Sequence, residues 1–221
     1  RAAGTKGSAP VGVTPPVGVA PPPPAQPPAG QPPQGGPSGG HPVPTNALVG
    51  GPQTFDYTGS ASLGKADAKV TLAIFSDFEC PACSQWSGNL KQMQAQFAEL
   101  KLVFKHMPLP FHSRARPAAI AAEAAARQGK FWEMHDLLFQ NQDNLSTARF
   151  VELAQQLKLD VARFKKDLDD KELAGKVQRD FVEGERARAP GTPTFYVNGV
   201  RADVQDPSAL HVLVDKAIKG S

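Results

Sequence analysis

The pattern of apolar and polar residues predicts a strand, a helix and a second strand between residues 70 and 107. Residues 70–75 read VTLAIF, a β-branched and apolar run typical of a strand buried on both faces. From residue 84 to 100, large apolar residues recur at spacings of three and four, which predicts a helix with one buried face. Residues 101–107, KLVFKHM, predict a second strand, and it should be parallel to the first because a helix connects the two.

The middle of the chain carries only helical patterns. Residues 114–128 are rich in alanine, which predicts a helix. Pro117 is tolerated in the first turn of that helix, and Gly129 indicates where it ends. Four more helical periods follow, over about 130–141, 147–158, 161–169 and 171–187. These patterns predict an all-helical insertion covering about residues 112–188.

A strand pattern returns near the C-terminus. Residues 193–197 and 200–203 flank Asn198-Gly199, the strongest short signal for a β-hairpin. An amphipathic helix is then predicted over about 207–219. The element order is βαβ, helices, ββα, which indicates an α/β fold with a helical insertion.

The first 54 residues differ in composition from the rest. They hold 15 of the 22 prolines and 11 of the 20 glycines, no acidic residue, and only Arg1 and Lys6 as fixed charges. Such a segment has too few large apolar side chains to offset the entropy of ordering its backbone. We interpret residues 1–54 as a disordered Pro/Gly-rich tether and residues 55–221 as the folded domain.

The charge of the folded domain argues against several classes of partner. Residues 55–221 carry all 21 acidic residues and 22 of the 24 Lys and Arg, a formal charge of +1. Nucleic acid and anionic membranes need a concentrated basic surface, so neither is expected as the main partner. No apolar run approaches the roughly 20 residues of a membrane span. Because the sequence starts at Arg1 without a signal pattern, we expect that a targeting segment was removed or that the sequence is a fragment.

Both cysteines lie in the stretch FSDFECPACSQW, where the first predicted strand gives way to a helix. The amides at a helix N-terminus favour ionisation of a thiol, and Cys80 is placed to benefit most. Cys83, one turn into the helix, should be more shielded. We therefore predict that Cys80 attacks and Cys83 resolves. Pro81 presets the helix start, and Ala82 indicates moderate stabilisation of the thiolate.

The sequence argues against two other interpretations of the cysteine pair. A zinc site needs four ligands, and the five histidines are scattered along the chain, at positions 41, 106, 112, 135 and 211. Two inert core cysteines would be unusual at a strand-to-helix junction behind a proline. Redox chemistry is favoured over both, with no metal and no cofactor.

A second motif, Gly191-Thr192-Pro193-Thr194, opens the strand over 193–197. A proline at the first position of an otherwise paired strand indicates a cis peptide bond in a tight turn. Alone the motif is weak evidence, because the glycine and proline of an ordinary loop would explain it equally well. It gains weight beside CPAC on the predicted βαβ…ββα frame.

Three segments together resemble the DsbA-like branch of the thioredoxin superfamily, in which a helical domain is inserted into a thioredoxin fold. They are VTLAIFSDFECPAC, PLPFHSRARPAAIAAEAAARQGKFWEMHDLLF and GTPTFYVNG, and the resemblance covers about residues 60–220. It implies a monomeric thiol-disulfide oxidoreductase that acts on cysteine-containing proteins and is regenerated by a redox partner. It also implies an oxidising, extracytoplasmic compartment such as the periplasm or cell envelope, to which the tether could attach the domain.

The resemblance also implies roles for particular residues. Cys80 is the nucleophile, Cys83 resolves, Pro193 is the cis-proline, and the Thr192 backbone faces the disulfide and can bind an extended substrate. Two departures concern the redox couple. Strongly oxidising relatives often have histidine where this chain has Ala82, and some carry a buried acid where it has Ile74. Proton transfer at Cys83 then needs another carrier, and the candidates are water, Asp77 and Glu79. The alternative is that both acids are solvated or cap a helix and carry no proton.

Further residues are assigned structural roles. His112 is expected to be a hydrogen-bonded loop histidine, and Phe131, Trp132, Met134, His135 and Leu138 a core stripe. Phe78 and Trp86 either pack in the core or form an apolar docking surface. Two alternative functions remain open: a disulfide reductase or isomerase, and a non-enzymatic binding module switched by its disulfide, with the tether as a ligand for proline-recognising domains.

Overall fold

The structure is a computed structural model that describes residues 46–220. The part of the predicted tether before residue 46 lies outside the described residues. The strands are β1 (Ala47–Val49), β2 (Ser62–Leu63), β3 (Val70–Ser76), β4 (Leu100–His106), β5 (Thr194–Val197) and β6 (Val200–Asp203). The helices are α1 (Pro81–Gln96), α2 (Ala115–Ala126), α3 (Phe131–Gln140), the 3-10 helix η1 (Gln142–Asn144), α4 (Thr147–Gln156), α5 (Val161–Leu168), α6 (Lys171–Arg186) and α7 (Pro207–Lys219).

A six-stranded sheet in the order β1-β6-β5-β3-β4-β2 forms the centre of the fold. Strands β3 and β4 are parallel, as the intervening helix predicted, and β5 runs antiparallel to β3. Asn198 and Gly199 both have positive φ, 47° and 82°, in the turn between β5 and β6. A Cβ atom on Gly199 would lie 2.2 Å from the Gln53 carbonyl oxygen, so this turn requires glycine.

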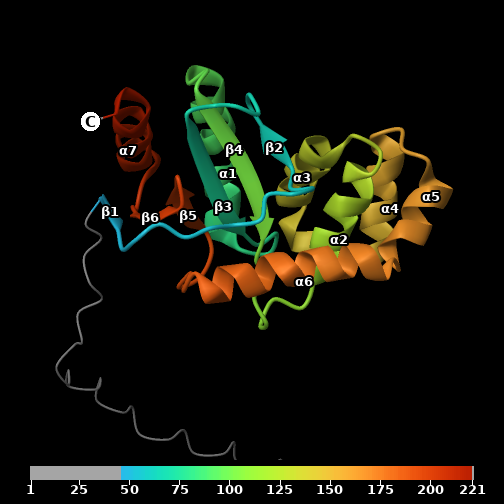
Figure 1. Ribbon diagram of the computed structural model, residues 1–221. Helices are drawn as coiled ribbons and strands as arrows, with labels where there is room; N and C mark the ends of the chain where they lie inside the picture. The colour runs from blue at the N-terminus through green and yellow to red at the C-terminus, as the bar shows by residue number, and fades with distance from the viewer. Residues whose placement is uncertain (1–45, 221) are drawn as a thin grey trace, which may run out of the picture. The chain divides into compact units, whose positions relative to one another are not determined.

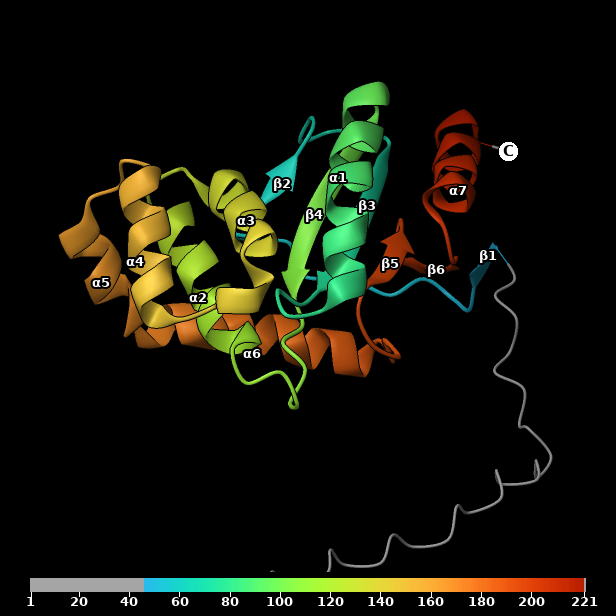
Figure 2. The same cartoon turned by 180° about the vertical axis from the view of Figure 1, so that it is seen from behind.

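Helices cover both faces of the sheet. Figures 1 and 2 show α1 and α7 on one face and α6 crossing the other. Leu72 and Ile74 pack in the large core cluster that includes residues of α1 and α7, whereas Ala73 and Phe75 belong to a smaller cluster against which Phe181 of α6 packs. Side chains alternate across a strand, so a strand buried on both faces is apolar throughout, which explains the VTLAIF run.

Helices α2 to α6 lie between β4 and β5 in sequence, and α2 to α5 form a cluster beside the β2 edge of the sheet (Figure 1). Helix α6 leads back to the sheet and approaches it closely at Gly184. A Cβ atom there would lie 2.9 Å from the Phe75 ring. This contact sets the distance between the helix and the strand that precedes the cysteines.

Two edge strands were not predicted. The sequence placed residues 46–54 in the tether, but Ala47–Val49 pairs antiparallel with β6. Strand β2 pairs with β4 in a segment for which no element was predicted. The tether boundary at residue 54 is therefore corrected: the sheet already includes Ala47. Both strands are only two or three residues long, too short for an alternation pattern.

Candidate active site

Cys80 is the residue immediately before the first turn of α1. Its backbone is extended, with φ −74° and ψ 117°, and Pro81 is the first helical residue. The Cys80 amide donates to the Asp77 carbonyl at 3.2 Å, and the Cys80 carbonyl accepts from the Ser84 amide at 3.3 Å. No acidic residue lies in the first turn of α1. The positive end of the helix therefore acts on the Cys80 sulfur, and the first turn adds no carboxylate that opposes it.

The surroundings of Cys80 favour its thiolate. The pKa of Cys80 is lowered to about 5, first by a hydrogen bond from the Cys83 thiol and, against the effect of burial, by Thr192 and the amides of Ala82 and Cys83. When it is protonated, the Cys80 thiol donates to the Thr192 carbonyl oxygen at 3.2 Å. The buried Thr192 hydroxyl has no hydrogen-bond partner among residues 46–220 and is therefore available to the sulfur. The site can therefore hold a negative charge on this sulfur.

The second cysteine has the opposite character. The Cys83 side chain is buried, with 1% of its surface exposed. Burial, followed by the neighbouring Cys80 sulfur, raises the pKa of Cys83 well above its usual range. Both cysteines are free thiols in this structure. The pair thus combines one sulfur that ionises readily with one that holds its proton.

The sheet topology brings the Thr192-Pro193 segment to the cysteines. Strand β5 pairs with β3, with Thr194 opposite Phe75, so the residues before β5 lie beside the residues after β3. The Thr192-Pro193 peptide bond is cis, as the motif predicted. The Thr194 hydroxyl donates to the Gly191 carbonyl at 2.7 Å and closes this turn.

Comparison with known proteins shows the family to which this chain belongs. A family model described as "Thioredoxin" matches residues 57–216. A "Probable disulfide bond formation protein D" of Bacillus cereus is 33% identical over 182 residues, covering 76% of this chain and 83% of that protein. This chain belongs to the DsbA-like thiol-disulfide oxidoreductases of the thioredoxin superfamily.

Two further relatives place this DsbA-like domain among known proteins. The crystal structure of oxidised BdbD from Bacillus subtilis is similar at a TM-score of 0.66 and 27% identity, covering 79% of this chain and 99% of BdbD. A "Na(+)/H(+) antiporter NhaA 3" of Salinispora tropica is 42% identical over 139 residues, which are 62% of this chain and 21% of the antiporter. The chain thus spans about a fifth of the length of that curated relative.

The two acids proposed as proton carriers bind the backbone of other segments. The Asp77 carboxylate accepts from the amides of Glu79 and Leu109 and contacts the His112 ring nitrogen Nδ1 at 2.8 Å. The Glu79 carboxylate accepts from the amides of Arg114 and Ala115 at the start of α2. These contacts give both acids structural roles and confirm His112 as a hydrogen-bonded loop residue.

Gln142 is a site residue that the sequence did not reveal. Its side-chain amide donates to the Phe78 carbonyl at 2.8 Å and to the Cys80 carbonyl at 3.0 Å. The residue belongs to η1, more than 60 positions after the turn that it holds. It lies in the polar stretch QNQDN, where no periodicity marks one residue among its neighbours. Only the folded helical insertion brings it to the cysteines.

The aromatic residues flanking the motif pack in the core. Phe78 is 1% exposed and stacks on Phe104 with ring centroids 5.5 Å apart. Trp86 is also buried and lies against Phe195 at 4.5 Å. Of the two interpretations given to Phe78 and Trp86, the structure supports core packing. The predicted stripe on α3 is likewise buried at Phe131, Met134, His135 and Leu138.

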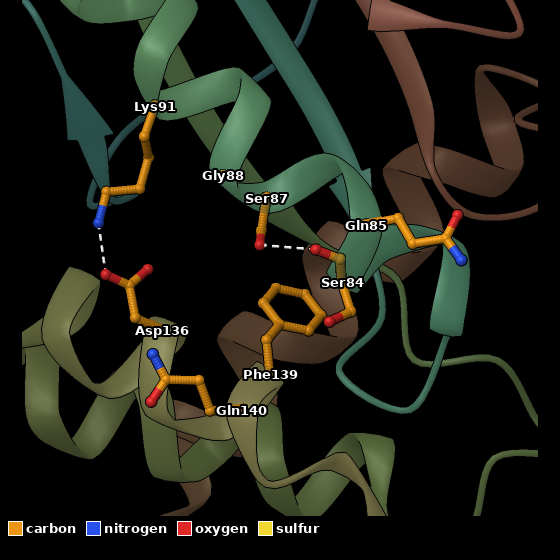
Figure 3. Close-up of a pocket in the computed structure, with 8 residues that line it drawn as sticks. All are labelled: Ser84, Gln85, Ser87, Gly88, Lys91, Asp136, Phe139 and Gln140. Carbon is orange, nitrogen blue, oxygen red and sulfur yellow. Dashed lines mark hydrogen bonds and ion pairs between the residues drawn. The ribbon is translucent and has the colours of Figure 1, made fainter.

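Two hollows lie next to α1 on the side of the helical insertion. An open pocket of about 530 Å³ separates α1 from α3, and Lys91 and Asp136 form an ion pair across it (Figure 3). A cavity of about 10 Å³ lies deeper, beside Cys83. Ser87 and Phe139 line both hollows. No group of acidic, histidine or cysteine residues in the described part of the chain could hold a metal, and no described helix could cross a membrane.

Proposed function

We propose that this domain exchanges disulfides with cysteine-containing proteins through Cys80 and Cys83, and that it forms disulfides outside the cytoplasm. The observation that carries the proposal is the contrast between the two sulfurs. Cys80 has a lowered pKa and lies at the helix start beside Thr192, whereas Cys83 is buried and holds its proton. Membership of the DsbA-like branch supports the same chemistry.

The reaction begins with the Cys80–Cys83 disulfide. A substrate thiolate attacks the Cys80 sulfur, a substrate–Cys80 disulfide forms, and the Cys80–Cys83 bond breaks with its electron pair on Cys83, which takes a proton. A second substrate thiolate then attacks the first substrate sulfur. The substrate disulfide forms and Cys80 leaves as a thiolate. The substrate is oxidised, the protein is reduced, and a partner's disulfide must reoxidise it.

The direction of exchange follows from the stability of the Cys80 thiolate. A dithiol whose thiolate is stabilised gives up its disulfide easily, so a pKa of about 5 favours oxidation of substrates. Ala82 supplies no additional stabilising side chain between the cysteines, so we expect a moderately oxidising couple. Extended substrates would bind along the Thr192 backbone, next to the sulfur that they attack.

The test measures turnover and equilibrium with the purified protein. The oxidised protein should oxidise a reduced two-cysteine peptide catalytically when a small-molecule disulfide is supplied, and Cys80→Ser should abolish this activity. Titration against glutathione should give a reduction potential above that of a structural disulfide. A strongly reducing potential would favour a reductase or isomerase. Oxidation of one peptide per protein molecule, without turnover, would favour a redox-switched binding module.

A further inference from the structure

The cavity beside Cys83 has the size and lining of a site for one water molecule. Its volume of about 10 Å³ is close to the least that a water needs. Most of its lining is apolar, but four polar side chains reach it, those of Ser76, Cys83, Ser87 and His135. The Ser76 hydroxyl is buried and has no hydrogen-bond partner within residues 46–220. A water here would have the two to four polar partners that buried waters require.

His135 connects this cavity with the surface. Its Nδ1 atom lies 2.9 Å from an oxygen of Asp136, and the other Asp136 oxygen pairs with Lys91 in the open pocket shown in Figure 3. Because a carboxylate only accepts hydrogen bonds, Nδ1 carries the proton and Nε2 carries the free electron pair. The ring itself is buried, with 3% of its surface exposed. It therefore stands between a buried thiol and a carboxylate that reaches solvent.

We propose that His135, acting through a water molecule in this cavity, takes the proton of Cys83 when Cys83 attacks a mixed disulfide on Cys80, and returns it in the reverse step. The proposal rests on the thiol exchange proposed above. In the forward step the proton passes from Cys83 to the water as the water gives a proton to Nε2. The Cys83–Cys80 bond forms, the bond from Cys80 to the partner sulfur breaks, and the partner leaves as a thiolate.

The charges around His135 suit this role. The groups that act on the ring are Asp136 on its own helix, Lys91 on α1 and His106 on β4. Burial lowers the pKa of His135, so the ring is a neutral base at pH 7, and the Asp136 carboxylate stabilises the imidazolium that forms. No carboxylate lines the cavity itself, to which β3 contributes Ile74 and Ser76. His135 thus supplies the base that Ile74 cannot.

The experiment follows the two phases of reaction between the reduced protein and Ellman's reagent. Cys80 releases one thionitrobenzoate as it forms the mixed disulfide, and Cys83 releases the second as it closes the protein disulfide. In the wild-type protein the second phase should be nearly independent of pH between about 6.5 and 8, because a neutral internal base is already present. In His135→Gln it should rise about tenfold per pH unit and be about a hundredfold slower at pH 7.

The first phase should be unchanged in His135→Gln, because Cys80 does not use this base. His211→Gln, on α7 and outside the cavity, is the matched control and should show the wild-type profile. A wild-type rate and a level profile in folded His135→Gln would overturn the proposal. If that variant does not fold, Asp136→Asn provides the second test, since this side chain is partly exposed. It should slow the second phase about tenfold, and an unchanged second phase would overturn the proposal.

The outcomes also separate this inference from the proposed function. Absence of a first phase, or failure of the wild-type protein to oxidise a peptide, would refute the thiol exchange itself. A normal wild-type reaction with an unaltered profile in His135→Gln would refute only the proton transfer.

Discussion

Two regions of this molecule differ in how many partners their buried polar groups have. One is the contact between α6 and β4, and the other is the turn that carries the cysteines. At the α6 contact, the Lys105 ammonium is 2% exposed and lies 2.6 Å from Asp180 and 2.7 Å from Glu183. It also donates to the Asp56 carbonyl at 2.8 Å. At the cysteine turn, the buried hydroxyls of Ser76 and Thr192 have no hydrogen-bond partner within the residues described.

The difference distinguishes structural from reactive polar groups. A buried charge is tolerated where fixed partners surround it, and such a cluster holds two elements together. A hydroxyl without a fixed partner is available to a group whose charge changes. Here the groups whose charge changes are the sulfurs of Cys80 and Cys83. Burial of Lys105 among fixed partners therefore stabilises the packing of α6 on the sheet. Burial of the Ser76 and Thr192 hydroxyls leaves two hydrogen-bond donors available to the sulfurs.

The largest expected effect separates the two cysteines. Cys83→Ala should abolish turnover while the first attack by Cys80 continues, because the mixed disulfide then has no internal thiol to resolve it. Mass spectrometry of the protein after reaction with a disulfide peptide should show one peptide bound per molecule. Catalytic turnover by Cys83→Ala at the wild-type rate would contradict the division of roles.

The next effect concerns the α6 contact. Lys105→Met removes the cation that pairs with the buried Asp180 and the partly exposed Glu183, and should lower the free energy of unfolding by about 3–5 kcal/mol. Lys219→Met removes an exposed pair with Asp215 on α7 and should cost less than about 0.5 kcal/mol. Urea unfolding measures both. Equal effects of the two substitutions would show that burial of the Lys105 cluster adds nothing.

A third prediction uses the pH dependence of Cys80. Its thiolate fraction, followed by ultraviolet absorbance or by alkylation rate, should reach half near pH 5. Thr192→Val keeps the shape of the side chain and removes the hydroxyl, so the midpoint should move upward by about one pH unit. An unchanged midpoint in Thr192→Val would show that this hydroxyl does not act on the sulfur.

The same shift affects stability. Because the folded-state pKa of Cys80 is lowered, the native reduced protein binds fewer protons than the unfolded chain between about pH 5 and 9. Its stability relative to Cys80→Ala should therefore rise with pH through this window and be lost as pH falls through about 5. A difference that does not vary with pH would contradict the lowered pKa.

The smallest effect is expected at Gln142. Gln142→Ala removes two hydrogen bonds to the turn before α1 and should lower the free energy of unfolding by about 1–2 kcal/mol. Gln140→Ala, at an exposed position two residues away, is the control and should cost less than about 0.5 kcal/mol. Thermal unfolding compares them. Equal values would show that the Gln142 bonds are replaced by water.

The elements with strong periodicity were predictable within a few residues. The helices α2 to α7 carry the pattern that one buried face imposes, β3 carries the apolar run of a strand buried on both faces, and the Asn198-Gly199 pair marks the hairpin. The short edge strands β1 and β2 carry no such pattern, because two or three residues cannot alternate detectably. Their places in the sheet are set by pairing with β6 and β4.

The sequence by itself determined the redox motif, the cis-proline motif and the fold class, because each depends on local residue order and on the period of buried side chains. The tertiary structure alone decided what surrounds the cysteines. In the folded chain the Asp77 and Glu79 carboxylates accept hydrogen bonds from backbone amides. Gln142 binds the turn before α1, and His135 lines the same cavity as Cys83. These contacts join residues far apart in the chain, and no local pattern encodes which distant side chain the packing of a helical insertion will bring to a given atom.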